Sequence, residues 1–257
     1  MQKNLTRIFF LLTLISVINL HATEIYPKWF LFPPEYPDLF IGYTYNGMSA
    51  ESDAANMYYA FKECIVVGTL EIFENELSDE LLKNSNYFYY FSPDSVDSLQ
   101  DRLNPVDRFD VSAFSKDQVL LYMLDELAAI DAPRVDANTL PVPSWKDKDF
   151  YQDQQYYYGI GMYTALGSEN DAWKTAEEQA IFSILTTLSV QVHNIRVVSK
   201  YNENNMQSVA LDQISFLKIK YLLRNIEIVE RYPDRENKLY YVLVRIPKNG
   251  VVSPLLR

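Results

Sequence analysis

An apolar stripe with helical spacing begins after Ser168 and is the clearest pattern in the chain. Its members recur every three or four residues, which places them on one face of a helix. Ser168 and Asp171 resemble a capping box, and Lys174, Glu177 and Glu178 fall between the apolar positions. We therefore predict a long helix with these three charged residues in solvent. The stripe consists of Trp173, Ala176, Ala180, Ile181, Ile184, Leu185 and Leu188.

A second apolar stripe predicts another helix in the first half of the chain, after Asp53. This stripe is less regular, and Gly68 weakens its C-terminal end because glycine is a poor helix former. Its members are Met57, Phe61, Cys64, Ile65, Gly68 and Ile72.

Alternating or aromatic runs predict strands around both helices. Residues 226–232 and 239–246 flank a polar turn and predict a hairpin, and residues 188–197 have strand composition. Residues 119–124 fit either a helix that starts at a capping box or the last strand of the first half. The remaining predicted strands are 39–45, 87–91 and 156–163. Residues 209–223 fit either a helix or a strand, and a strand is favoured from residue 214 onward.

The two halves of the chain carry the same features in the same order. A Pro-x-Trp motif opens each half, an aromatic strand containing glycine follows, and an Asp-Ala pair lies early in each helix. The copies are roughly 117 residues apart, which indicates an ancient duplication. The paired features are Trp29 and Trp145, Gly42 and Gly161, and Asp53-Ala54 and Asp171-Ala172.

Together these patterns predict an α+β protein of two tandem related domains, each an antiparallel sheet packed on one face by a long helix. We place the first domain at residues 23–130 and the second at residues 143–257. The proline-containing segment 131–142 is the predicted linker.

The first 22 residues predict a signal peptide. Lys3 and Arg7 precede an apolar run that is short for a membrane span, and Ala22 ends a tolerable cleavage site. We expect export by a cleaved signal to the periplasm or the outer membrane, with a retained N-terminal anchor as the alternative. Cys64 is the only cysteine, so no intramolecular disulfide can form in that compartment.

The charge of the chain argues against nucleic-acid binding. The sequence has 23 basic and 34 acidic residues, and cleavage would remove two of the basic ones, taking the net charge from −11 to −13. An acidic surface repels phosphate backbones. With only 7 glycines and no phosphate-binding loop, a nucleotide site is also not expected.

A series of motifs in the second half is similar to a known family. Trp145 precedes a strand that ends Gly159-Ile160-Gly161, a helix with Asp171-Ala172-Trp173 follows, and then comes Ser189-Val190-Gln191-Val192. This series resembles the LPP-twenty type of bacterial outer-membrane lipoprotein domains and the N-terminal domain of flagellar assembly protein T. The resemblance covers most of residues 143–247 and, more faintly, 27–124. It implies a periplasmic or outer-membrane-associated protein with no catalytic residues to carry over, and the chain lacks the lipobox cysteine.

Two single residues have reactive side chains. His193 is the only histidine beyond the predicted signal peptide, and we expect a packed or surface histidine on a strand rather than a base or a zinc ligand. Cys64 lies on the apolar face of the first predicted helix, where we expect a buried thiol that does not ionise.

Paired carboxylates offer candidate acid–base chemistry, but they fall on predicted solvent faces or helix ends. We expect solvated acids there, and no catalytic, cofactor or metal residues. Asp147, Asp149 and Asp153 lack the glycine and glutamate spacing of a calcium loop. The pairs are Glu74/Glu76, Asp79/Glu80, Asp125/Glu126 and Glu177/Glu178.

Runs of aromatic residues on strands are the remaining signal. Consecutive strand residues point to opposite faces, so these rings cannot all enter one core. Exposed tyrosines suit a protein interface or carbohydrate stacking, unless the helix and the sister half cover both faces. The candidate interaction surface is Tyr87, Tyr89, Tyr156, Tyr157 and Tyr158.

We therefore expect a non-enzymatic protein of the cell envelope that binds another envelope protein or a second copy of itself, with no cofactor and no transmembrane span in the mature chain. A glycan is a further possible ligand. Two alternatives stay open. An enzyme acting on envelope glycans would need a deep cleft with two facing acids, and a small-ligand sensor would hold its ligand between the two halves.

Overall fold

The computed structural model describes residues 25–45, 47–75, 78–90, 96–111, 117–125, 128–165, 167–204 and 214–252. The side chains of residues 70–97 and 190–218 lie outside this description. The predicted signal peptide and Phe91 also fall outside the described residues.

The second half forms a four-stranded antiparallel sheet with one helix packed on it, as predicted. The strand order is β11-β12-β9-β8, and the helix α5 packs along β9 and β12. The predicted hairpin is confirmed as β11 and β12. The bounds are β8 Phe150–Gln152, β9 Tyr156–Thr164, α5 Glu169–Asn204, β11 Glu227–Asp234 and β12 Leu239–Pro247.

The first half repeats this topology on a smaller scale. Its strand order is β2-β6-β5, and the helix α3 packs against β2. In both halves the strand before the helix pairs with the last strand of the half, which pairs with the strand preceding it. Residues 119–124 are therefore a strand. The bounds are β2 Leu39–Tyr43, α3 Ala50–Lys62, α4 Val96–Gln100, β5 Leu103–Asp110 and β6 Gln118–Leu124.

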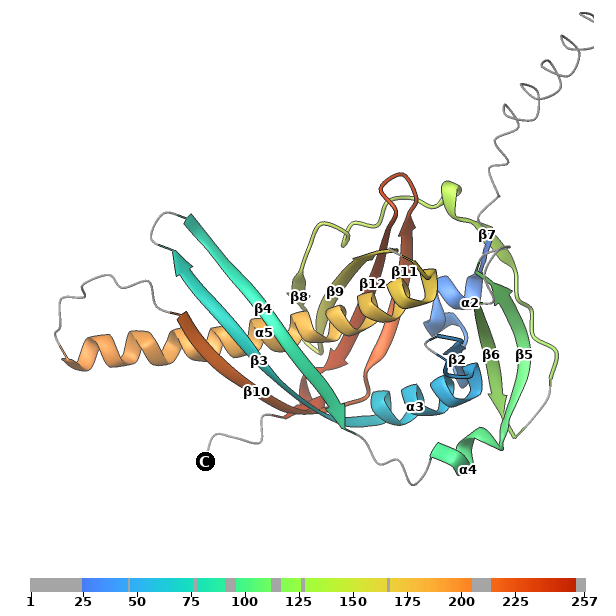
Figure 1. Ribbon diagram of the computed structural model, residues 1–257, viewed down its shortest axis with the longest axis horizontal. Coiled ribbons are helices and arrows are strands. Elements are labelled where there is room, and N and C mark those ends of the chain that lie inside the picture. Colours follow the sequence, from blue (N-terminus) through green and yellow to red (C-terminus); the bar gives the residue numbers. More distant parts are fainter. Residues whose placement is uncertain are drawn as a thin grey trace, which may run out of the picture.

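Each helix is followed by a long strand, and these two strands pair with each other. β3 follows α3, β10 follows α5, and they run antiparallel from Glu63↔Arg224 to Phe73↔Ile214. With β4 they form an arm that extends from the body together with the C-terminal half of α5 (Figure 1). The sheet order is β13-β10-β3-β4, with β3 Glu63–Asn75, β4 Ser78–Tyr90, β10 Ile214–Arg224 and β13 Val251–Val252.

The predicted linker packs on the body. Its strand β7 (Arg134–Asp136) pairs with β1 (Ile25–Pro27) at the start of the first half. After β1 the chain makes the one-turn helix α2 (Lys28–Leu31), which buries Trp29 and Phe30. Three short 3₁₀ helices complete the described elements: Pro33–Glu35, Ala137–Thr139 and Lys248–Gly250.

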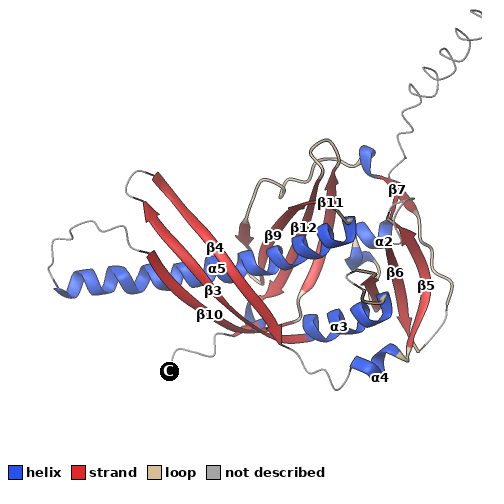
Figure 2. Ribbon diagram, in the orientation of Figure 1, coloured by secondary structure: helices blue, strands red, loops and turns tan. Residues whose placement is uncertain are grey.

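One hydrophobic core spans both halves. Trp29, Phe30 and Val119 from the first half and Trp173 and Val242 from the second belong to a single buried cluster. The helix α5 packs on β9 and β12, and its C-terminal part continues beside the arm (Figure 2). The two halves therefore share this core, and each half also has a smaller buried cluster of its own. None of the helices in the described ranges is long and apolar enough to cross a membrane.

Glycine marks the same contact in both halves. A Cβ on Gly42 would lie 1.9 Å from the Ala50 carbonyl oxygen, and a Cβ on Gly161 would lie 1.9 Å from that of Ala176. Only glycine lets each strand approach its helix this closely. This match makes Ala50 the counterpart of Ala176.

The glycine contact also corrects the predicted alignment of the helices. The backbone N–H of Tyr43 donates to Asp53 at 2.9 Å, and that of Met162 donates to Gln179 at 3.4 Å. Asp53 thus corresponds to Gln179, and the predicted match with Asp171 is wrong. The reason is that α5 starts about two turns earlier, relative to its glycine contact, than α3 does.

A hydrogen bond from tryptophan to a carboxylate is the second contact that both halves share. Trp29 Nε1 donates to Asp107 at 2.6 Å, and Trp145 Nε1 donates to Glu230 at 2.8 Å. Each carboxylate follows a register shift in its strand, between Pro105 and Asp107 in β5 and between Ile228 and Glu230 in β11. A bulge re-aims the side chains beside it. The correspondence between the two halves therefore extends to individual hydrogen bonds.

Two predicted boundaries are wrong. The predicted strand 188–197 is helical, because α5 continues to Asn204 with no glycine or proline to stop it. The first helix ends at Lys62, and Glu63 has extended backbone (φ −160°, ψ 125°). Cys64 therefore lies on β3 and His193 lies on α5, opposite to the predicted elements.

Candidate functional site

The three predicted tyrosines of β9 divide between the two faces of the sheet. Tyr157 packs against the core shared by both halves, whereas Tyr158 packs against a smaller cluster on the outer face. Tyr156 lies two residues from Tyr158 and shares its face. All three rings are half-buried. The prediction that consecutive rings would serve different faces is confirmed for this strand.

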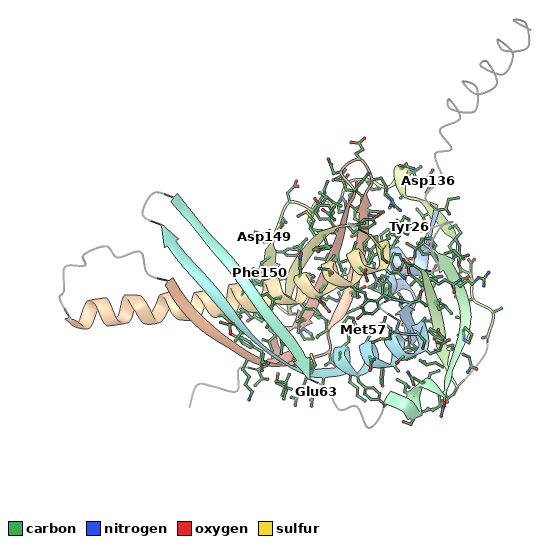
Figure 3. The ribbon with its side chains drawn as sticks, in the orientation of Figure 1. Tyr26, Met57, Glu63, Asp136, Asp149 and Phe150 are labelled. Atoms are coloured by element: carbon green, nitrogen blue, oxygen red, sulfur yellow. The ribbon has the colours of Figure 1, made fainter. Side chains whose placement is uncertain are left out.

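The outer face carries a stacked tyrosine pair. Tyr151 on β8 lies opposite Tyr158 on β9, with ring centroids 4.5 Å apart and planes inclined by 5°. Burial raises the pKa of the Tyr151 hydroxyl to about 12, so this side chain is neutral at physiological pH. Phe150 begins β8 and Asp149 precedes it, and both are labelled at this edge of the body in Figure 3.

Basic side chains lie over these rings. Lys148 Nζ is 4.9 Å from the Tyr151 centroid, and the Arg245 guanidinium is 4.8 Å from that of Tyr156. Such cation–π contacts hold the rings in place. We call Lys148, Tyr151, Tyr156, Tyr158 and Arg245 the aromatic face.

Asp153 orders the turn that joins the two strands of this face. Its carboxylate accepts hydrogen bonds from the backbone N–H groups of Gln155 and Tyr156 and from the Tyr158 hydroxyl. The hydrogen bonds from these two backbone groups hold the pKa of Asp153 below its ordinary value. Asp153 therefore has a structural role at the turn, and its oxygens are occupied by protein donors.

The other two predicted surface residues, Tyr87 and Tyr89, lie on β4. This strand is at the end of the sheet order, so its outer edge is unpaired within the described ranges. The side chains of both tyrosines lie outside the described residues. The structure therefore separates the five predicted residues into two places, on the arm and on the outer face of the second sheet.

A buried cluster of charges joins the two halves, and the sequence pattern did not predict it. Lys174 and Glu177 are fully buried, so their predicted placement in solvent is wrong. Lys174 Nζ lies 3.0 Å from Asp53 Oδ1 of α3. Arg231 Nη2 donates to Glu177 Oε1 at 2.7 Å, and the Tyr43 hydroxyl donates to the same oxygen at 2.6 Å. The first half thus supplies one acid and one hydroxyl to a cluster centred on α5.

The charges of this cluster balance. Burial alone would lower the pKa of Lys174, but the carboxylates of Asp53 and Glu177 outweigh it and raise the pKa above its ordinary value. Lys174 therefore stays protonated and neutralises Asp53. Arg231 pairs with Glu177 and also donates to the Phe30 carbonyl at 2.6 Å. Two buried cations face two buried anions, which is the arrangement that buried charges require.

Two cavities adjoin this cluster. The larger has a volume of about 470 Å³ and lies between the Pro33–Leu39 segment, α3 and β11. The smaller has a volume of about 200 Å³ and lies between α3 and α5. Glu177, Met57, Phe61 and Ile226 line both. Met57 is labelled on α3 in Figure 3, in the space that faces α5.

The two single reactive residues differ in how far they are described. Cys64 is buried, as predicted, and burial raises the pKa of its thiol to about 12, so it is protonated at neutral pH. The side chain of His193 lies outside the described residues. Among the side chains that are described, no three histidine, cysteine, aspartate or glutamate residues gather closely enough to hold a metal ion.

The comparisons with known proteins leave the resemblance noted above a prediction. No protein-family model, no curated protein and no solved structure matches this chain.

Proposed function

We propose that this protein is a non-enzymatic module of the cell envelope that binds another protein through the aromatic face. The stacked and cation-covered tyrosines of β8 and β9 carry this proposal. Tyrosine and arginine are enriched at protein interfaces. Tyrosine offers a large contact area with few rotatable bonds, and arginine offers hydrogen-bond donors in a fixed geometry.

The position of the rings supports binding. Tyr151, Tyr156 and Tyr158 remain half-exposed although a cluster with Trp145, Tyr232 and Tyr241 lies beside them. Contacts with Lys148 and Arg245 restrict the rings before any partner arrives. A pre-ordered surface loses less conformational entropy on association, which favours affinity.

The acids between the two halves favour this proposal over glycan hydrolysis. A glycosidase needs one carboxylate free to give a proton and a second free to act as base or nucleophile. Asp53 is neutralised by Lys174, and Glu177 accepts hydrogen bonds from Arg231 and Tyr43 through one oxygen. Both acids therefore belong to ion pairs of the buried cluster that joins the two halves.

The test is site-specific photo-cross-linking in envelope fractions of the native cell. A photoreactive amino acid at Tyr156 is expected to give one dominant adduct, because this position contacts the partner. The same amino acid at Tyr89 tests the competing surface on β4. An adduct from position 89 and none from position 156 would move the interface to the arm.

Matched variants separate binding from folding. Tyr156→Ser and Arg245→Ser are expected to abolish the adduct formed from a photoreactive residue at position 158 while the melting temperature changes little. Tyr163→Ser, on the same strand beyond the aromatic face, is the control and should leave the adduct intact. If Tyr156→Ser leaves the adduct yield unchanged, the aromatic face is not the interface.

A further inference from the structure

The sheet of the second half has a short strand, β8, for which the sheet of the first half has no counterpart. β8 pairs with Tyr157–Gly159 of β9, and just beyond this pairing the Ile160 N–H donates to the Asp149 carbonyl at 3.0 Å. In the first half β2 is the end of its sheet, and no strand in the described ranges pairs with its outer edge. β2 therefore has a free edge at the place where β9 is covered.

The glycine contacts identify the residues of β2 that are left uncovered. Gly42 and Gly161 make the same contact with the helix of their half. The three residues before Gly42, Leu39–Ile41, therefore take the place of Tyr158–Ile160 in β9. All three are half-buried, so solvent reaches this edge of the strand.

The backbone N–H of Ile41 points to the free edge. The Thr44 N–H donates to Gln118 next to β6, whereas the Tyr43 N–H is turned the other way and donates to Asp53. Successive N–H groups alternate between the two edges of a strand, so that of Ile41 points outward, like that of Tyr43. No described residue accepts a hydrogen bond from it. The first half thus has the donor of this contact and lacks the carbonyl acceptor that the second half supplies.

The segment before β2 is too short and too rich in proline to supply the missing strand. The stretch from the tryptophan to the shared glycine is three residues shorter than in the second half, and β8 has three residues. The segment also contains Pro33, Pro34 and Pro37, and proline cannot donate to a strand ladder. It forms the 3₁₀ helix Pro33–Glu35, which packs on β11.

The larger cavity lies where the strand is missing. Leu39, Phe40 and Ile41 line it from β2, together with residues of α3 and β11. A residue in a sheet occupies about 160 Å³, given a rise of about 3.3 Å, a strand spacing of about 4.8 Å and a layer spacing of about 10 Å. The cavity volume of about 470 Å³ therefore has room for about three residues, which is the length of β8.

The lining of this cavity favours apolar side chains. Its buried charges, Glu177 and Arg231, are paired with each other, and Glu227 is paired with an arginine of β12. Asp38 and Lys62 also line it, and they are exposed and opposite in charge. An occupant therefore does not need to bring a charge. The apolar residues contributed by α3 and β11 are Met57, Tyr58, Phe61, Ile226 and Ile228.

We propose that the outer edge of β2 binds an extended segment of a partner protein as an added strand. The segment runs antiparallel to β2, as β8 does to β9, and one of its carbonyls accepts a hydrogen bond from the Ile41 N–H. Its next residue lies opposite Phe40, on the face of β2 that packs on α3, and contacts Met57 and Phe61. The residues on either side of it face β11. The partner segment therefore has three consecutive apolar residues.

This site is separate from the aromatic face. The aromatic face lies on the sheet of the second half, whereas the free edge belongs to the sheet of the first half. Failure of one site therefore leaves the other intact.

The amide of Ile41 gives a direct readout of the proposed hydrogen bond. The chain beyond residue 22 is labelled with ¹⁵N and titrated with the peptide acetyl-Gln-Val-Leu-Val-Gln-amide. The Ile41 amide is expected to shift and, in the complex, to exchange with solvent at least about tenfold more slowly, with a dissociation constant below about 1 mM. The Ile160 amide already donates to Asp149, so it is the internal control and should not change.

Two N-methylated peptides test the geometry of the strand. In the proposed register the N–H of the first valine faces β2, and that of the leucine faces away from it. Methylation of the first valine nitrogen should therefore abolish binding, whereas methylation of the leucine nitrogen should leave the peptide bound. Equal binding of all three peptides would overturn strand pairing and leave only a pocket for apolar groups.

Variants of the protein test the same hydrogen bond from the other side. Ile41→Pro removes the N–H but leaves the ladder between β2 and β6, because this N–H points away from β6. It should not bind the peptide, whereas Ile41→Val keeps the N–H and should bind it with unchanged affinity. Met57→Trp narrows the cavity from α3 and should weaken binding at least about tenfold in a folded protein, which keeps the test valid if Ile41→Pro does not fold.

Two results in the native chain would overturn the proposal. One is an Ile41 amide that neither shifts nor exchanges more slowly at millimolar peptide. The other is slow exchange of Ile41 without peptide that becomes slower as the protein concentration rises, together with dimers in sedimentation. That result would assign the edge of β2 to a second copy of this chain in place of a partner protein.

Discussion

Two tryptophan–carboxylate pairs occupy equivalent places in the two halves, but the pKa values of their carboxyl groups shift in opposite directions. Burial works to raise the pKa of Asp107, but hydrogen bonds from Arg134 and Trp29 outweigh it, so the pKa lies below its ordinary value. Burial also raises the pKa of Glu230, and there the hydrogen bond from Trp145 does not offset it. The geometry is shared, but among the described residues only Asp107 accepts hydrogen bonds from an arginine, Arg134. The two halves therefore share the hydrogen bond but differ in the electrostatic surroundings of its carboxylate.

The two helices likewise share one contact and differ in another property, their length. Both halves keep the glycine contact and the hydrogen bond from the following residue to the helix, although α3 has 13 residues and α5 has 36. Helix length is free to change because it does not enter the strand–helix contact. The close approach at Gly42 and Gly161 is fixed because backbone atoms on both sides define it.

The largest expected effect concerns the charges between the halves. Glu177→Leu leaves Arg231 buried without its carboxylate and should lower the free energy of unfolding by about 3–5 kcal/mol. Arg231→Met should have a similar effect. The double variant should recover most of this loss, because no unpaired charge from this pair remains in the core. Urea denaturation of the four proteins measures the coupling, and additive losses would contradict a direct ion pair.

The glycine contacts give an intermediate effect. Gly161→Ala and Gly42→Ala each place a Cβ against a helix carbonyl and should cost about 1–3 kcal/mol of unfolding free energy. Gly167→Ala is the matched control, because nothing lies within 4 Å of its Cβ position, and it should cause no loss. A thermal melt of each variant tests this order. If Gly42→Ala alone is tolerated, the two contacts are not equivalent.

The smallest effect concerns pH and contrasts the two tryptophan pairs. The pKa of Asp107 is depressed, so its stabilisation is present above the unfolded-state pKa near 4 and is lost as the pH falls through the folded-state pKa. Asp107→Asn should therefore destabilise at pH 7 by about 1 kcal/mol and have less effect near pH 3. The pKa of Glu230 is raised, so its ionisation opposes folding above pH 4.

Glu230→Gln is the matched comparison. It keeps an acceptor for Trp145 and removes a buried charge, so it should not lower the stability at pH 7. Denaturation curves between pH 3 and pH 7 distinguish the two variants. Parallel pH profiles for Asp107→Asn and Glu230→Gln would contradict the difference between the pairs.

Sequence patterns predicted the α+β class, the terminal hairpin and the shared tryptophans and glycines, because these features depend on local periodicity and on motifs. They misplaced two boundaries for a physical reason. In residues 188–197 the β-branched residues favour a strand locally, yet the helix continues past Ser189, which hydrogen-bonds Tyr221 of β10. After Lys62 the stripe positions at Cys64 and Ile65 fit helical spacing, but pairing with β10 makes them a strand.

The charge cluster could not be predicted from local patterns. Lys174 and Glu177 are three residues apart between the apolar positions of a helix, which is the usual place for solvated charges. Their partners Asp53 and Arg231 are 121 and 54 residues away in sequence. The prediction that neighbouring tyrosines of β9 lie on opposite faces of the sheet was confirmed, because alternation within one strand assigns faces without knowledge of distant residues.

The pairing of β3 with β10 also limits how much of the protein can fold while it is being synthesised. The paired residues Glu63 and Arg224, at the end of the arm next to the body, are 161 residues apart in the sequence. During synthesis β3 and β4 therefore emerge long before their sheet partner, and the newly made first copy has an open hairpin with an unpaired edge. A chain of this kind cannot finish folding from its N-terminus alone. We therefore expect that neither half folds as an independent unit.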